Sequence, residues 1–100
     1  MVAIDEVNNA IKQTEGKIDY SEIDWEFIDG MALRMNANKN KYPKDNVDNM
    51  TEHDIPLLEQ AAFRHLRKML QPVEDDTESY TDHMFAVADN LMMIYKIMQS

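Results

Sequence analysis

The chain has 100 residues, of which 44% are hydrophobic and 29% are charged, a composition typical of one small domain and too apolar for a disordered tail. It contains no cysteine, which excludes disulfide scaffolds, thiolate metal sites and cysteine nucleophiles. Its net charge of −9 disfavours binding to nucleic acid phosphates. No apolar run approaches the roughly 18 residues that span a bilayer. We therefore expect a cytoplasmic protein whose partners are neither nucleic acids nor membranes.

Apolar residues recur at helical spacing in four stretches, and no strand pattern competes with them. The first stretch predicts a short helix at about residues 2–14, with Gly16 as its stop signal. The second predicts a helix over residues 21–38, in which the interior Gly30 costs about 1 kcal/mol relative to alanine. The apolar stripe of this second helix consists of Trp25, Ile28, Ala32 and Met35.

A polar connector at residues 39–50 separates the second predicted helix from the third. Thr51 and Asp54 then form a variant of the capping box, a pair of side chains that predicts the start of a helix. This third helix continues to about Leu70 and stops before Pro72.

An acidic loop at residues 71–80 leads to the last predicted helix, which begins near Thr81 or Asp82 and ends near Met98. The sequence therefore predicts an all-α fold, a small bundle of three main helices plus a short N-terminal helix. We expect a single domain over residues 1–100, made of an N-terminal helix and linker at 1–20 and a core at 21–100.

Helical wheels place four polar side chains toward the apolar faces of the last two helices, and these are Glu59, His65, His83 and Asn90. Burying such groups unpaired costs about 1–3 kcal/mol each, so we expect them to meet one another, water or a ligand. The short loop makes the two helices antiparallel neighbours, which lets His65 approach His83. The same wheels place Asp89 and Lys96 on the solvent side.

Two interpretations of the inward polar group stay open. In the first, it is a structural network in which each histidine satisfies a carboxylate or a backbone carbonyl. In the second, it forms a functional site together with Glu78 of the acidic loop. A separate stripe on the second helix is either a solvated acidic face or a metal site shared with another helix or subunit, and it consists of Glu22, Glu26 and Asp29.

Four ordered motifs stand out between residues 25 and 98. They are Lys41-Tyr42-Pro43 with Asn46, then Leu58 with Ala61-Ala62-Phe63-Arg64-His65-Leu66, then Glu74, Asp76 and Glu78, then His83 with Ala86-Val87-Ala88-Asp89-Asn90. In this order they resemble a small phage-encoded family described as dATP/dGTP diphosphohydrolase, N-terminal-domain-like. That family is related to the all-α MazG-type nucleotide pyrophosphohydrolases. The usual MazG carboxylate pattern is not reproduced, and Ala86 stands where many family members carry a second histidine.

The resemblance implies a MazG-like enzyme that hydrolyses a nucleoside triphosphate to a monophosphate and pyrophosphate with Mg²⁺ or Mn²⁺. It implies Glu59 and Glu78 as metal ligands, with Asp76 as an auxiliary ligand. It further implies that His65 or His83 orients the attacking water or a phosphate, so that these two histidines and Glu59 are the expected catalytic residues.

The resemblance also implies residues that bind the substrate. Asn90 is expected to hold the nucleotide, and Arg64 or Lys41 to neutralise phosphate charge. Proteins of this type form dimers or tetramers, so we expect a homo-oligomer.

The incomplete carboxylate pattern leaves two other functions open. The chain could be a non-catalytic nucleotide-binding protein, such as a sponge for a cyclic nucleotide signal of host immunity. Alternatively, it could be a small acidic inhibitor that binds a host protein through its charged surface.

Overall fold

The computed structural model describes residues 16–39 and 49–99, and within these ranges the chain is helical without any strand. The elements are α2 at Trp25–Asn38, the short 3₁₀ helix η2 at Glu52–Asp54, α4 at Ile55–Leu70 and α5 at Tyr80–Met98. The predicted all-α class with three main helices is confirmed. The helix predicted at residues 2–14 lies outside the described residues, and the predicted division at residues 20 and 21 stays a prediction.

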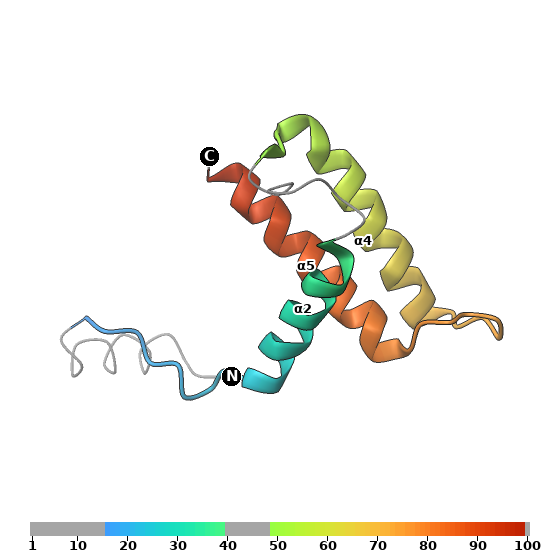
Figure 1. Ribbon diagram of the computed structural model, residues 1–100, viewed down its shortest axis with the longest axis horizontal. Helices are drawn as coiled ribbons and strands as arrows, with labels where there is room; N and C mark the ends of the chain where they lie inside the picture. Colours follow the sequence, from blue (N-terminus) through green and yellow to red (C-terminus); the bar gives the residue numbers. More distant parts are fainter. Residues whose placement is uncertain (1–15, 40–48, 100) are drawn as a thin grey trace.

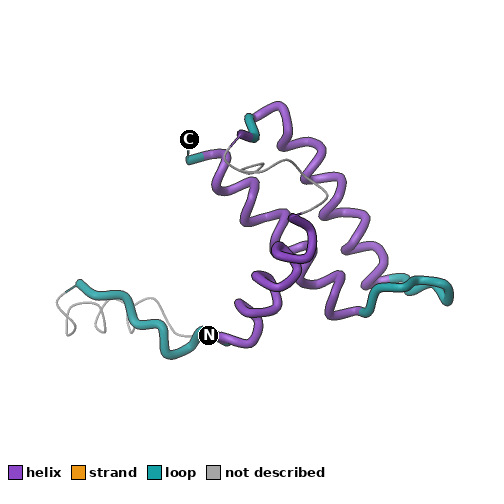
Figure 2. The backbone as a smooth tube through the Cα atoms, viewed as in Figure 1, coloured by secondary structure: helices purple, strands orange, loops and turns teal. Residues whose placement is uncertain are grey.

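Helices α4 and α5 form an antiparallel pair, joined by the acidic loop, and α2 crosses α5 (Figures 1 and 2). Within the described ranges, the buried apolar side chains are Leu58 and Ala62 on α4 and Ala86 and Ile97 on α5. Two of these four are alanines, whose small side chains allow the helix backbones to approach closely. Burial of apolar surface along this pair holds the two helices together.

Capping boxes start both helices of the pair. At the first start, the N–H of Thr51 donates to Oδ2 of Asp54 at 2.8 Å, and Oγ1 of Thr51 accepts from the N–H of His53 at 3.3 Å. The predicted capping box is therefore confirmed, although the first turn is 3₁₀ and the α-helix begins at Ile55. Ser79 caps α5, which begins slightly before the predicted Thr81.

Helix α2 starts later than predicted. Its N-cap is Asp24, whose Oδ1 accepts hydrogen bonds from the N–H groups of Glu26 at 3.0 Å and Phe27 at 3.3 Å. The predicted start at Ser21 is wrong because the Asp24 carboxylate satisfies the free N–H groups of the first turn at this point instead.

Gly30 sets the face on which α2 packs against α5. A Cβ atom at this position would overlap the ring of Phe85, so the aromatic ring lies directly against the α2 backbone. Phe27 adds an edge-to-face contact with the same ring, with the ring centroids 5.2 Å apart. The predicted apolar stripe is wrong at Trp25 and Ile28, which are 59% and 41% exposed, and at Ala32, which is also exposed, because the close contact at Gly30 turns another face of α2 toward α5.

The outer face of α4 keeps apolar side chains at the surface. Phe63, Leu66 and Leu70 are exposed, and together with Arg67 and Gln71 they line a shallow groove of about 370 Å³. The apolar side of α4 is thus wider than the part of it that packs against α5. Among the described residues, no helix is both long enough and apolar enough to cross a membrane.

Candidate functional site

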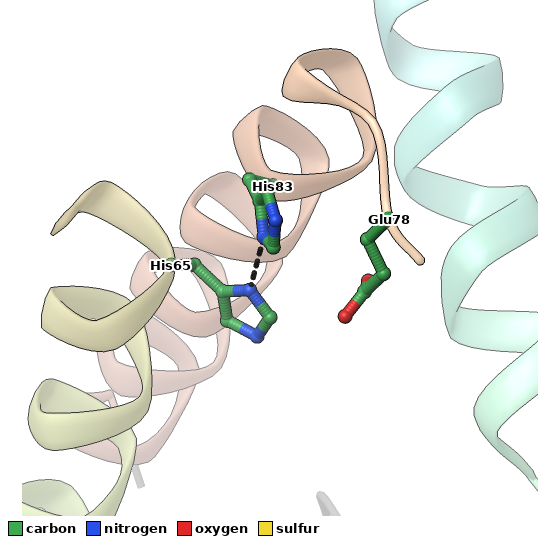
Figure 3. A group of neighbouring side chains, drawn as sticks. All are labelled: His65, Glu78 and His83. Carbon is green, nitrogen blue, oxygen red and sulfur yellow. Dashed lines mark hydrogen bonds between the residues drawn. The ribbon is translucent and has the colours of Figure 1, made fainter. Parts of the chain in front are cut away.

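A polar cluster lies where the C-terminal half of α4, the end of the acidic loop and the first turns of α5 meet. His65 comes from α4, Asp76 and Glu78 from the loop, and His83 from α5. Figure 3 shows that the two histidine rings face each other and that Glu78 lies beside them, toward α2. The two histidines lie within helices, and the two carboxylates lie in the loop just before the capped start of α5. These elements fix the relative positions of the four side chains.

His83 is the centre of this cluster. Its side chain is almost wholly buried, and its Nε2 lies 2.5 Å from Oδ2 of Asp76. Because an ionised carboxylate can only accept, Nε2 of His83 carries the proton in this contact. Nδ1 of His83 then presents a lone pair, and it lies 2.8 Å from Nδ1 of His65.

Asp76 holds both His83 and the loop. Its Oδ1 accepts a hydrogen bond from the N–H of Glu78 at 2.9 Å while Oδ2 contacts His83. These two contacts, the backbone bond first, hold the pKa of Asp76 below its ordinary value. Asp76 is therefore ionised at neutral pH and orients the imidazole ring of His83.

Glu78 is held from the other side by α2. Its Oε2 forms an ion pair with Nη1 of Arg34 at 2.7 Å, and this contact lowers the pKa of Glu78. Burial, followed by the nearby Arg34 charge, lowers the pKa of His65. At neutral pH the cluster therefore contains two ionised carboxylates and a neutral His65, the states in which these groups bind metals.

The cluster meets the geometric requirement for a metal site. Within the described part of the chain, His65, Glu78 and His83 each offer one ligand atom, and these atoms lie within 4.8 Å of one another. Two imidazole nitrogens and one carboxylate oxygen suit Mn²⁺ and the later transition metals, whereas Mg²⁺ prefers oxygen ligands and retained water. Of the two ions expected from the sequence, Mn²⁺ therefore fits these residues better.

The expected approach of His65 to His83 is confirmed, and Asp76 and Glu78 join them. Asn90 is buried on α5, as the helical wheel predicts. The structure brings together the following expected site residues: His65, Asp76, Glu78 and His83.

Two other expected residues are not in the cluster, and the structure does not describe a third. Glu59 and Arg64 are exposed on α4, and Lys41 lies outside the described residues. The inward orientation predicted for Glu59 is wrong, because it lies at the N-terminal end of the uncovered apolar arc that continues through Phe63 and Leu66. The wheel identified the apolar side of α4 but not the part of it that α5 covers.

Sequence reasoning missed Arg34 as a member of the site. It lies one helical turn after Gly30 and therefore on the face of α2 that packs against α5. A glycine in the middle of a predicted helix, four residues before an arginine, was the available signal. The acidic stripe of Glu22, Glu26 and Asp29 is exposed, in line with its interpretation as a solvated face.

The position of Asp89 differs from the prediction. The wheel placed it on the solvent side, yet its side chain is buried, and neither carboxylate oxygen has a hydrogen-bond partner among the described residues. Burial raises the pKa of Asp89 to about 6. The prediction is wrong because α5 is covered on two sides, by α4 and by α2, whereas the wheel assumed one covered face.

Comparisons with known proteins give one informative match. The family model described as dATP/dGTP diphosphohydrolase, N-terminal, matches residues 7–100, which confirms the resemblance drawn from the sequence motifs. Searches of curated proteins and of solved structures give no significant match.

Proposed function

The chain belongs to the dATP/dGTP diphosphohydrolase N-terminal family, and we propose that it hydrolyses a purine deoxynucleoside triphosphate to the monophosphate and pyrophosphate. The observation that carries the proposal is the convergence of His65, Glu78, His83 and Arg34 at one end of the helical pair. Hydrolysis of a triphosphate requires groups that neutralise charge and orient water, and this cluster supplies both kinds.

The charge around the cluster supports binding of a triphosphate. The chain carries a net charge of −9, which repels polyphosphates in general. Two cations nevertheless act on the cluster, since Arg34 and Lys68 both contribute to the electrostatic environment of His65. Arg34 thus takes the phosphate-neutralising role expected for Arg64 or Lys41.

In the proposed reaction, the oxygen of a water molecule forms a bond to the α-phosphorus. The bond from that phosphorus to the oxygen bridging to the β-phosphate breaks, and pyrophosphate leaves with the electron pair. The proton that the water loses passes to the pyrophosphate or to solvent. A divalent ion held by His65, Glu78 and His83 would neutralise phosphate charge and make the water more acidic. Asp76 keeps His83 oriented, and Arg34 binds phosphate oxygens while keeping Glu78 in place.

The test is incubation of the purified protein with Mn²⁺ and each of the four deoxynucleoside triphosphates, followed by mass spectrometry of the free and protein-retained nucleotides. We expect equal amounts of monophosphate and pyrophosphate from dATP or dGTP. Glu78→Gln should abolish the products, while Glu74→Gln, an exposed change in the same loop, should leave them unchanged.

Two other outcomes would overturn this proposal. Retention of one unaltered nucleotide on the protein would identify a nucleotide-binding protein, and that nucleotide could be cyclic. No product and no retained nucleotide would favour an acidic protein that binds a protein partner.

A further inference from the structure

The two histidines of the cluster are already spaced as two ligands of one ion. Their Nδ1 atoms lie 2.8 Å apart and face each other (Figure 3). With metal–nitrogen bonds of about 2.0–2.1 Å, two nitrogens on one ion are about 2.9 Å apart at a right angle and about 3.3 Å apart at a tetrahedral angle. The separation of the two nitrogens therefore needs to change by only a few tenths of an ångström, while both rings turn so that their lone pairs converge on the ion and the proton between them moves to the far nitrogen of His65.

The hydrogen bond between His83 and Asp76 favours the same conclusion. Asp76 accepts from Nε2, which leaves the lone pair of the other nitrogen directed at His65. A carboxylate that holds the far nitrogen of a metal-binding histidine is a recurrent feature of metal sites, because it fixes the ring and makes the ligand more basic. Here the carboxylate is itself fixed by the backbone N–H of Glu78 at 2.9 Å.

A contact with a neighbouring residue also orients Glu78. Arg34 binds its Oε2 at 2.7 Å, which orients the carboxylate and leaves Oε1 available to an ion. Glu78 also directly precedes Ser79, the N-cap of α5, so its backbone position is fixed by the start of that helix. His83 is therefore held in place by Asp76 and Glu78 by Arg34, while His65 is held by its position within α4.

We propose that His65, Glu78 and His83 form a three-ligand site for an imidazole-preferring transition-metal ion of the Mn²⁺ to Zn²⁺ series, with Asp76 and Arg34 as positioning residues. Two nitrogen ligands disfavour Mg²⁺ and Ca²⁺, which prefer oxygen. Three protein ligands leave coordination positions open for water or phosphate oxygens, as in catalytic rather than structural sites. The inference rests on the proposed function for the use of the ion, but its evidence is the ligand geometry alone.

Metal binding without nucleotide tests this site directly. The metal-free protein is titrated calorimetrically with Mn²⁺, Co²⁺, Zn²⁺ and Mg²⁺, and the visible spectrum of the Co²⁺ form reports on nitrogen ligands. We expect one ion per chain and an affinity for Co²⁺ and Zn²⁺ at least about 100-fold higher than for Mg²⁺, in line with the ligand preferences of these ions.

The chain offers a matched control for the histidines. His65→Gln should abolish tight binding of Co²⁺, whereas His53→Gln, which changes the exposed third histidine, should leave it unchanged. Asp76→Asn should weaken binding by about tenfold to 100-fold and alter the Co²⁺ spectrum, because it acts through His83. Thermal unfolding of each metal-free variant verifies that the fold is intact.

The outcomes separate this inference from the proposed function. Equal affinities for Mg²⁺ and Co²⁺, or equal losses from His65→Gln and His53→Gln, would overturn the metal site. Hydrolysis of a nucleotide that needs only Mg²⁺ and survives His65→Gln would overturn the site and keep the proposed activity. Tight Co²⁺ binding at His65 without any hydrolysis would establish the site and remove the activity.

Discussion

Nε2 of His83 lies 2.5 Å from Oδ2 of Asp76, and this contact determines which nitrogen of the buried ring faces His65. With its proton held toward Asp76, His83 directs a lone pair across the seam between α5 and α4. Here one nitrogen is oriented by a carboxylate and the other meets a second imidazole, an arrangement suited to an ion.

Arg34 provides the first prediction. Arg34→Gln removes the ion pair with Glu78 and one positive charge near the phosphates, so kcat/KM for the nucleotide should fall by about tenfold to 100-fold, as expected for loss of a charged hydrogen bond. Arg34→Lys should recover part of the loss because it restores the charge. Steady-state kinetics measures both variants. Values of kcat/KM for Arg34→Gln that match the unmodified protein would show that Arg34 does not act on the substrate.

Gly30 provides a prediction about stability. Gly30→Ala improves helix propensity, but the added Cβ overlaps the Phe85 ring and must displace it. We expect the free energy of unfolding to fall by about 1–3 kcal/mol, as in other overpacked contacts. Urea unfolding measures this change. The control is Asn36→Ala, at an exposed position of α2, which should stabilise the protein slightly; a gain in stability from Gly30→Ala would contradict the close contact.

Asp89 predicts how stability depends on pH. Burial raises its pKa from 3.8 to about 6, so the folded state binds this proton more tightly than the unfolded state does. The resulting stabilisation is complete below about pH 4 and is lost as the pH rises through about 6. The shift corresponds to roughly 3 kcal/mol.

Asp89→Asn should therefore remove the decline in stability between about pH 4 and pH 6, and it should make the protein more stable than the unmodified chain at pH 8. Urea unfolding at several pH values measures the difference. Asp29→Asn, an exposed change on α2, is the control and should keep the decline. An unchanged decline in Asp89→Asn would show that another group causes it.

The surface of α4 predicts self-association. Its exposed Phe63, Leu66 and Leu70 lie beside Arg64 and Arg67. The exposed side of α2 and of the segment before it combines apolar with acidic side chains, namely Glu22, Trp25, Glu26, Ile28 and Asp29. Apolar contact and opposite charge make these two surfaces complementary, so we expect the α4 surface of one copy to bind the α2 surface of another.

Sedimentation equilibrium tests this association. The unmodified protein should be a dimer or larger, and Leu70→Glu should shift it to monomers by placing a charge in the apolar contact. Gln60→Glu adds the same charge at another exposed position of α4 and should leave the assembly intact. A monomeric unmodified protein would contradict the prediction.

Features that depend on neighbours along the chain were predictable from the sequence. The capping pair Thr51 and Asp54 acts within a few residues, and the stop at Leu70 follows from the approach of Pro72, so both were predictable. A short loop between two helices dictates an antiparallel pair, and helical spacing then brings His65 to His83. The all-α class and the histidine contact follow from these local rules.

Which face of α2 packs against α5 could be learned only from the tertiary structure. A helical wheel finds an apolar side but not which part of it a neighbour covers, so Glu59 was placed inward and Asp89 outward. The close contact of Gly30 with Phe85 sets the rotation of α2, which exposes Trp25 and brings Arg34 to Glu78. Such contacts join residues far apart in the sequence, and their outcome depends on the shapes of both surfaces, which no periodicity within one helix encodes.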